Sequence, residues 1–166
     1  MSEFSRIIDA VRLPHAELVL DATSEECAAL AKRFGLVAIN SLAARIKLAP
    51  DGPAVTATGT LSADIVQSCA VSGDDLPVLI NEPLSLRFVP APDERAEEIE
   101  LETEQLDEIE MEETRFDLGE ALAQSLALAI DPYAEGPGAE EFRRKAGILG
   151  EGESGAFGAL KDLLKK

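Results

Sequence analysis

The sequence predicts an α+β domain in which an antiparallel sheet, open or curled toward a barrel, packs against two helices. Three observations predict this class. Alternating segments joined by turn sequences fill residues 36–88, helical patterns flank them at residues 23–34 and 117–130, and the composition is globular, with 46% hydrophobic and 28% charged residues. A chain of 166 residues is long enough to bury one core, and with six Phe, one Tyr and no Trp we expect that core to be aliphatic, built from Leu, Ile, Val and Ala.

The N-terminal part predicts one extended segment and one helix. Residues 4–13 alternate loosely, which favours a first strand or an extended arm that Pro14 closes. Thr23 and Glu26 have the spacing of a capping box, in which each side chain accepts a hydrogen bond from a backbone N–H that the helix leaves free. Apolar residues follow at helical spacing up to Gly35, so a helix of about three turns is predicted.

Three strands are predicted in the middle of the chain. Residues 36–48 alternate with a change of face near Asn40 and Ser41, which indicates a bulge. Residues 55–66 have one apolar face and one face made almost entirely of hydroxyl side chains, which is the clearest strand pattern in the chain. Residues 76–88 form a third strand that we expect to break at Asn81-Glu-Pro83. Turn sequences at 50–53 and 73–75 join the three strands into an antiparallel meander with one buried face.

A strongly acidic segment follows. Residues 93–120 hold fourteen acids and two bases, a net −12 of the formal −17 of the chain. Residues 98–102 and 107–111 alternate apolar and acidic residues, which predicts short edge strands with outward carboxylates. Such a segment repels phosphate and attracts cationic surfaces, although a charge run is also typical of a solvated face. We expect a partner-binding acidic face made of Glu97, Glu98, Glu100, Glu102, Glu104, Glu108, Glu110, Glu112 and Glu113.

The C-terminal part predicts a second helix and then a tail. Asp117 is a suitable N-cap, an apolar stripe runs through residues 118–129, and Asp131-Pro132 ends the helix. The glycines and proline at 136–138 predict the end of a single domain, 1–138, which includes the acidic connecting segment 93–117. Residues 139–166 are then a flexible tail with a short amphipathic helix at 156–164.

The sequence offers little catalytic chemistry, so we expect a protein that is not an enzyme, with no catalytic residues, metal, cofactor or small-molecule substrate. His15 is the one histidine and stands beside Pro14, which favours a surface position. Cys27 and Cys69 could hold zinc together with a carboxylate, but a zinc site usually contains a close Cys pair, so a buried inert thiol is the preferred interpretation of Cys69. No secretory signal and no apolar run of membrane-spanning length is found, so we expect the cytosol, with both thiols reduced.

The order of these elements resembles the YceD family, the large ribosomal RNA subunit accumulation proteins of bacteria and plastids. The resemblance rests on Gly59 in the hydroxyl-faced strand, the turn segment 67–72, the strand end 86–90, the acidic stretch, the helix 117–132 and a terminal segment at 157–163. It implies a cytosolic, non-catalytic factor needed for normal levels of large-subunit ribosomal RNA. Many members carry Cys-x-x-Cys at the hairpin, where this chain has Cys69 and Ser72. A metal role of the family's cysteine pair is therefore not expected of this chain. The terminal family motif matches Phe157, Leu160, Leu163 and Lys165, whose helical spacing suits either a partner-docking helix or one that folds back onto its own core.

The leading functional hypothesis is therefore ribosome biogenesis. In one mechanism the acidic face binds a basic ribosomal protein or assembly factor. In the alternative, ribosomal RNA is contacted directly by the basic residues of the C-terminal segment, namely Arg143, Arg144, Lys145, Lys161, Lys165 and Lys166. A hydrolase with an acidic metal site is a distant third.

Overall fold

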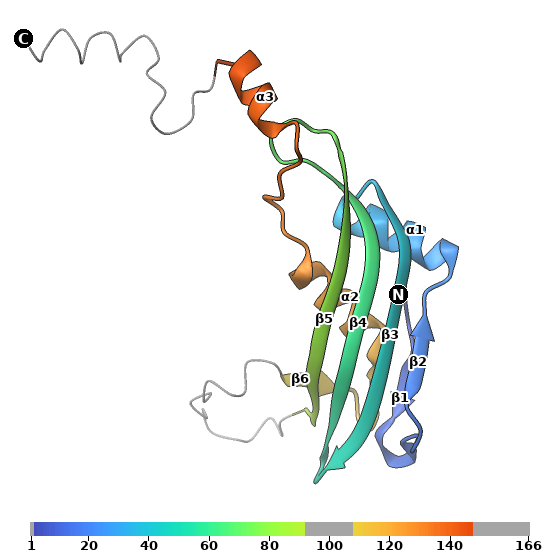
Figure 1. The fold of residues 1–166 in the computed structure, drawn as a ribbon. Helices are drawn as coiled ribbons and strands as arrows, with labels where there is room; N and C mark the ends of the chain where they lie inside the picture. Colours follow the sequence, from blue (N-terminus) through green and yellow to red (C-terminus); the bar gives the residue numbers. More distant parts are fainter. Residues whose placement is uncertain (1, 92–107, 148–166) are drawn as a thin grey trace, which may run out of the picture. The chain divides into compact units, whose positions relative to one another are not determined.

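A computed structural model describes residues 2–91 and 108–147 of the chain, which divide into two compact units (Figure 1). The larger unit takes in residues up to Gln67 together with Pro77–Ile130. The smaller unit takes in Ser68–Leu76 and the residues from Asp131 onward.

The larger unit is built on a five-stranded sheet. Its strand order is β2 (Leu18–Asp21), β3 (Ala38–Asp51), β4 (Ala54–Ser68), β5 (Asp75–Pro90) and β6 (Glu108–Met111). A second, two-stranded sheet pairs β1 (Ile7–Asp9) with β7 (Arg115–Asp117), and one turn of 3-10 helix, η1 (Ala10–Arg12), follows β1. Within the described residues the larger sheet is open, with β2 and β6 at its edges, so it is not a closed barrel.

The predicted α+β class is confirmed, with differences in the strands. β2 and β3 are antiparallel, as are β3 and β4, but β6 runs parallel to β5, so the sheet is mixed rather than wholly antiparallel. β2 was not predicted. The predicted break at Asn81-Glu-Pro83 is wrong, because β5 continues through it. β6 pairs only with Arg87–Pro90, so in the described part of the chain no strand lies beyond β5 at Pro83, and a proline is tolerated where its missing N–H would face no neighbouring strand.

The long β3–β4 hairpin contains two features that follow directly from the sequence. The register shifts between Ile39 and Ser41, which confirms the predicted bulge. Gly59 lies opposite Ile46, and a Cβ atom at Gly59 would lie 1.8 Å from the carbonyl oxygen of Arg45. Only glycine therefore permits the two backbones to approach this closely.

Two helices cover the inner face of the sheet, α1 (Ser24–Phe34) and α2 (Leu118–Ala129), both behind the strands in the view of Figure 1. Alternate residues of β3 and β4 point inward and join both helices in one core, while Thr58, Thr60 and Ser62 stay exposed on the opposite face. The core is mainly aliphatic, but it also contains three phenylalanines: Phe4, and Phe88 stacked on Phe116 with ring centroids 4.0 Å apart. Its largest fully buried side chains are Phe4, Phe88, Leu30, Ile46, Leu61, Ile65, Leu118, Leu122, Leu126 and Val55.

The ends of both helices are fixed by the residues that the sequence indicated. Thr23 and Glu26 form the predicted capping box, and Gly35 ends α1 in a left-handed conformation with a φ of 67°. The Asp117 carboxylate accepts a hydrogen bond from the N–H of Glu120 and so caps α2.

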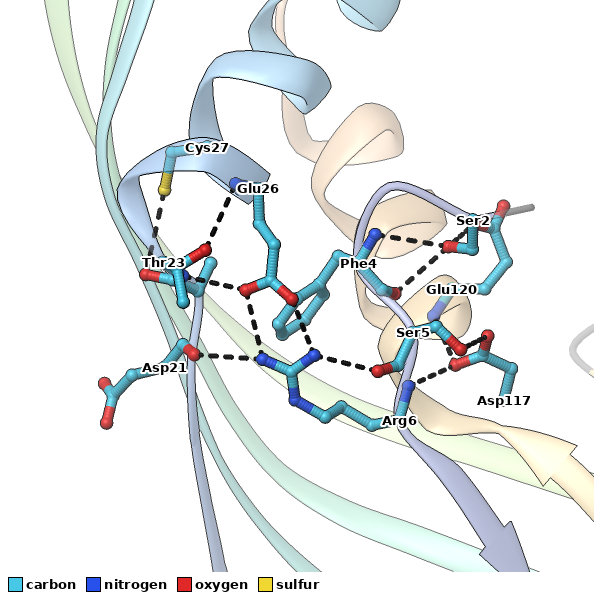
Figure 2. Close-up of polar contacts among 11 residues, drawn as sticks. Ser2, Phe4, Ser5, Arg6, Asp21, Thr23, Glu26, Cys27, Asp117 and Glu120 are labelled. Atoms are coloured by element: carbon cyan, nitrogen blue, oxygen red, sulfur yellow. Dashed lines mark hydrogen bonds and ion pairs between the residues drawn. The ribbon is translucent and has the colours of Figure 1, made fainter.

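The residues before β1, from Ser2 to Arg6, form an N-terminal arm that lies between the two helices and joins them (Figure 2). The Arg6 guanidinium donates to both carboxylate oxygens of Glu26 in α1, at 2.7 and 3.0 Å, while the Arg6 backbone N–H donates to Asp117 at 2.7 Å. Phe4 is buried beside them, and the guanidinium lies 4.5 Å from the centre of its ring. Gly119 makes room for this arm, since a Cβ atom there would lie 2.4 Å from the carbonyl oxygen of Phe4.

The smaller unit joins the end of the β4–β5 hairpin to the segment after α2. The N–H of Ala70 donates to the carbonyl of Ala134 at 3.0 Å, and a third helix, α3 (Ala139–Lys145), follows. The sequence analysis did not predict α3. Among the described residues, no helix is long and apolar enough to cross a membrane.

Candidate interaction site

The described part of the predicted acidic face consists of β6 and the tight turn that leads from it to β7, which together we call the ribbon. The backbones of Glu112 and Arg115 exchange two hydrogen bonds of 2.9 Å, and Glu113 takes a left-handed conformation with a φ of 58° to close the turn between them. Glu110, Glu112 and Glu113 are exposed, whereas Glu108 is half-buried. Glu97, Glu98, Glu100, Glu102 and Glu104 of the same prediction lie outside the described residues.

The acids of the ribbon differ in how far they are neutralised. Glu108 forms an ion pair with Arg87 at 2.5 Å, and Arg87 also contacts Asp51 at 3.2 Å. Within residues 2–91 and 108–147, neither Glu110 nor Glu112 has an ion-pair partner. No cation of the described residues therefore neutralises these two carboxylates.

An open hollow of about 460 Å³ lies beside this ribbon, between β6, β7, β1 and α2, and we call it the acidic hollow. Its apolar lining includes Ile7, which is 60% exposed, and the buried Phe116. The full lining is Ile7, Ile109, Glu110, Glu112, Arg115, Phe116, Asp117, Glu120, Ala121 and Gln124. It combines uncovered apolar surface with four carboxylates and one guanidinium.

Two of these carboxylates are already occupied with holding the fold together. Asp117 accepts from Ser5 Oγ at 2.6 Å and from the N–H groups of Arg6 and Glu120. Glu120 receives two hydrogen bonds from the Arg33 guanidinium, at 2.7 and 3.0 Å, which lowers the pKa of its carboxyl group to about 2. Among the described residues, Glu110 and Glu112 are therefore the carboxylates of the hollow that have neither an ion pair nor a hydrogen-bond donor.

The sequence indicated the acids of this site but not the hollow. Ile7 and Glu120 meet there although they lie more than a hundred positions apart in the sequence. For the apolar lining at Ile7, the one local signal was the loose alternation of residues 4–13. That pattern predicted a strand, but it did not indicate that the strand pairs with β7.

Cys69, in the smaller unit, is the second predicted position with unusual chemistry. Cys69 is only 3% exposed. Its Sγ accepts hydrogen bonds from the N–H of Gly136 at 3.2 Å and from the N–H of Ser72 at 3.4 Å. The Gly136 N–H has the largest effect and, with the hydroxyl and N–H of Ser72, it lowers the pKa of the Cys69 thiol to about 6. The thiol is buried as expected, but these contacts favour its charged form.

Neither cysteine is joined to another residue covalently. Cys27 is also buried and free, and desolvation raises the pKa of its thiol. At the family's second cysteine position, Ser72 uses its N–H and hydroxyl to stabilise the Cys69 sulfur. No group of three His, Cys, Asp or Glu side chains placed to hold a metal occurs among the residues that the structure describes. His15, the other residue considered for chemistry, is exposed.

The basic residues proposed for RNA contact are only partly described. In α3, Arg143 forms an ion pair with Glu135, and Lys145 forms one with Glu141 at 2.7 Å. Arg144 has no ion pair within the described ranges. The remaining predicted residues, Phe157, Leu160, Lys161, Leu163, Lys165 and Lys166, lie outside those ranges.

Comparison with known proteins agrees with the family that the motifs indicate. Residues 57–164 match the model of the family described as large ribosomal RNA subunit accumulation protein YceD. This match covers more than half of the chain and includes most of β4, all of β5, the acidic segment and both helices that follow it. Neither a curated protein nor a solved structure matches the chain.

Proposed function

Because the chain belongs to the YceD family, we propose that it is a non-catalytic factor that supports accumulation of large-subunit ribosomal RNA by binding a basic ribosomal protein or assembly factor. The family description links the chain to large-subunit ribosomal RNA accumulation. The protein partner and the acidic binding face are our proposal.

One observation carries this proposal. Glu110, Glu112 and Glu113 are exposed on a ribbon held by backbone hydrogen bonds, and none of the three has an ion pair among the residues described. They belong to a segment with a net charge of −12, which attracts cationic protein surfaces over about a Debye length of 8 Å at physiological salt. The same field repels the phosphates of RNA.

Direct RNA binding through α3 has weaker support. Two of the three basic residues of α3 are paired with Glu135 and Glu141, so they would have to exchange these partners for phosphates. We therefore expect weak affinity for naked ribosomal RNA and tight, salt-sensitive association with a cationic protein.

The test is a pulldown of the tagged full-length protein from cells that produce it naturally, with Glu110, Glu112 and Glu113 replaced together by Lys. We expect this triple reversal to abolish a complex that the unmodified chain forms at low salt. A matched control reverses three exposed acids elsewhere, Glu17, Glu82 and Asp75, and changes the net charge by the same amount.

The proposed function also predicts weak binding to naked ribosomal RNA. A gel-shift assay with large-subunit ribosomal RNA at physiological salt is expected to show no tight complex. Submicromolar RNA affinity that survives the triple reversal, or a protein complex that is lost equally in both charge variants, would contradict binding through the ribbon.

A further inference from the structure

The lining of the acidic hollow is complementary to one particular kind of side chain. Ile7, 60% exposed, provides apolar surface at the hollow, and the carboxylates of Glu110 and Glu112 line the same space without ion-pair partners in the described part of the chain. A lysine or arginine has a long apolar stem and a cationic end, so it can satisfy both features at once.

We infer that the acidic hollow receives a lysine or arginine side chain of the protein partner, with the stem against Ile7 and the cation at Glu110 and Glu112. This inference rests on the proposed function and adds the place and the chemical class of the central contact. Charge complementarity selects the occupant, because an acidic side chain or a nucleic acid phosphate would bring another negative group to a hollow lined by four carboxylates and one guanidinium.

The fold supports a preformed site of this kind. The hollow is lined by β1, β6, β7 and α2. β1 pairs with β7, the Asp117 contacts to Ser5 and Arg6 tie the start of α2 to the segment before β1, and β6 is held by its pairing with β5 and by the Arg87–Glu108 ion pair. The Glu120–Arg33 ion pair holds α2 to α1. A site that is already shaped before binding costs less ordering entropy when the partner arrives. Its volume of about 460 Å³ also falls in the range typical of binding clefts, roughly 300–1,000 Å³.

Arg115 gives the inference a distinctive consequence. It lines the hollow and has no ion pair among the described residues, so its guanidinium repels an incoming cation. Removing its charge is therefore expected to strengthen binding, whereas removing the charges of Glu110 and Glu112 is expected to weaken it. A residue that merely supported the fold would not produce these opposite signs.

The experiment is a titration of the full-length ¹⁵N-labelled protein with three synthetic hexapeptides, followed by NMR. One peptide alternates glycine with lysine, the second replaces lysine by norleucine, which keeps the stem and removes the charge, and the third uses diaminopropionic acid, which keeps the charge and shortens the stem. We expect the lysine peptide to bind at least about tenfold more tightly than either of the others, a difference of about 1.4 kcal/mol. Its shifts are expected at Ile7, Ile109 and Glu110.

Protein variants complete the test. Glu110→Gln with Glu112→Gln is expected to weaken the lysine peptide about tenfold, and Ile7→Thr and Arg115→Gln are each expected to change its affinity about threefold, to weaker and to tighter binding respectively. Glu17→Gln with Glu82→Gln is the matched control and is expected to leave the affinity unchanged. Amide spectra of each variant without peptide show whether it is folded.

The outcomes separate the hollow from the broader function. Equal binding of the lysine and diaminopropionate peptides, or equal loss in the two double Gln variants, would overturn the inference, while the proposed function stands if the triple reversal still abolishes the natural complex. Conversely, specific lysine binding in the hollow together with a natural complex that ignores the triple reversal would refute the proposed function, and it would also overturn the assignment of that natural partner as the occupant of the hollow.

Discussion

Cys69 shows how a few backbone groups can set the chemistry of one side chain. Its sulfur is buried, which by itself favours the neutral thiol, yet the N–H groups of Gly136 and Ser72 point at it and favour the thiolate. Gly136 follows Cys69 by 67 positions, so no local sequence pattern could have indicated the contact. The sequence predicted a buried thiol correctly, but it had no means to predict the charge.

This lowered pKa predicts how stability depends on pH. The pKa of the Cys69 thiol falls from an ordinary value of 9.0 to about 6 in the folded chain, so folding gains stability that is fully present above about pH 9 and is lost as the pH falls through 6. The unfolding free energy of the unmodified protein should therefore rise relative to that of Cys69→Ala between pH 6 and pH 8.5. Urea denaturation in the presence of a reductant measures this difference.

Cys27→Ala is the control for this experiment. Burial raises the pKa of the Cys27 thiol above its ordinary value of 9.0, so the unfolding free energy of the unmodified protein should not rise relative to that of Cys27→Ala between pH 6 and pH 8.5. Parallel pH profiles of the unmodified protein and Cys69→Ala would show that the sulfur is not held as a thiolate.

At the scale of elements, the N-terminal arm and the helices form a single polar network. Arg6 connects the arm to the N-terminus of α1, and Arg33 near the C-terminus of α1 binds Glu120 in the first turn of α2 (Figure 2 shows the Arg6 side of this network). The same Glu120 carboxylate also accepts from Ser2 and Gln124. The arm and both helices therefore depend on carboxylates that must stay ionised.

Acid titration is the test of this network. The pKa of Glu120 falls from 4.5 to about 2, so its stabilisation is fully present above about pH 4.5 and is lost as the pH falls through 2. Glu120→Gln should be less stable than the unmodified chain by about 1 kcal/mol at pH 7, the upper end for partly exposed ion pairs. We expect the gap in unfolding free energy to close as the pH approaches 2. Glu82→Gln, at an exposed position, should show no gap, and a gap for Glu120→Gln that persists at pH 2 would contradict the role of the ionised carboxylate.

The elements that could be predicted are those fixed by neighbouring residues. The capping box at Thr23 and the bulge at Asn40 and Ser41 are written in a few consecutive positions, and both are found. β2 is only four residues long, and its identity as a strand comes from pairing with β3. The parallel direction of β6 depends on the path of the chain between residues 91 and 108, which composition does not specify.

At the scale of the whole molecule, charge and strand edges decide which contacts with other molecules are favoured. A net charge of −17 makes copies of the chain repel one another, and the acidic segment is visible in the sequence alone because charge is a property of composition. The hollow beside it is not, since it exists only after β1, β6, β7 and α2 are assembled. The open edge of β5 is likewise a feature that exists only in the assembled sheet.

β5 carries Pro77 and Pro83, and upstream of Arg87 it has no strand on its β6 side within the described ranges. Proline cannot donate a hydrogen bond to an added strand, so two prolines six positions apart interrupt the row of donors that a second chain would need. The sequence analysis treated Pro83 as part of a break within a strand. In the folded chain it is better explained as protection of an edge.

Replacing both Pro77 and Pro83 by Val should therefore promote self-association through this edge. Repulsion between chains of net charge −17 opposes it at low salt, and the Debye length shrinks from about 10 Å at 0.1 M salt to about 3 Å at 1 M, so the effect should appear mainly at high salt. Sedimentation velocity at both salt concentrations, compared with the unmodified chain, measures it. Pro90→Val is the control, because Pro90 already pairs with Met111 of β6. If the double variant sediments like the unmodified chain at 1 M salt, the two prolines do not protect the edge. The presence of Pro83 within β5 would then be explained only by the packing of Ile80 and Leu84 into the core, which holds the strand in place on both sides of it.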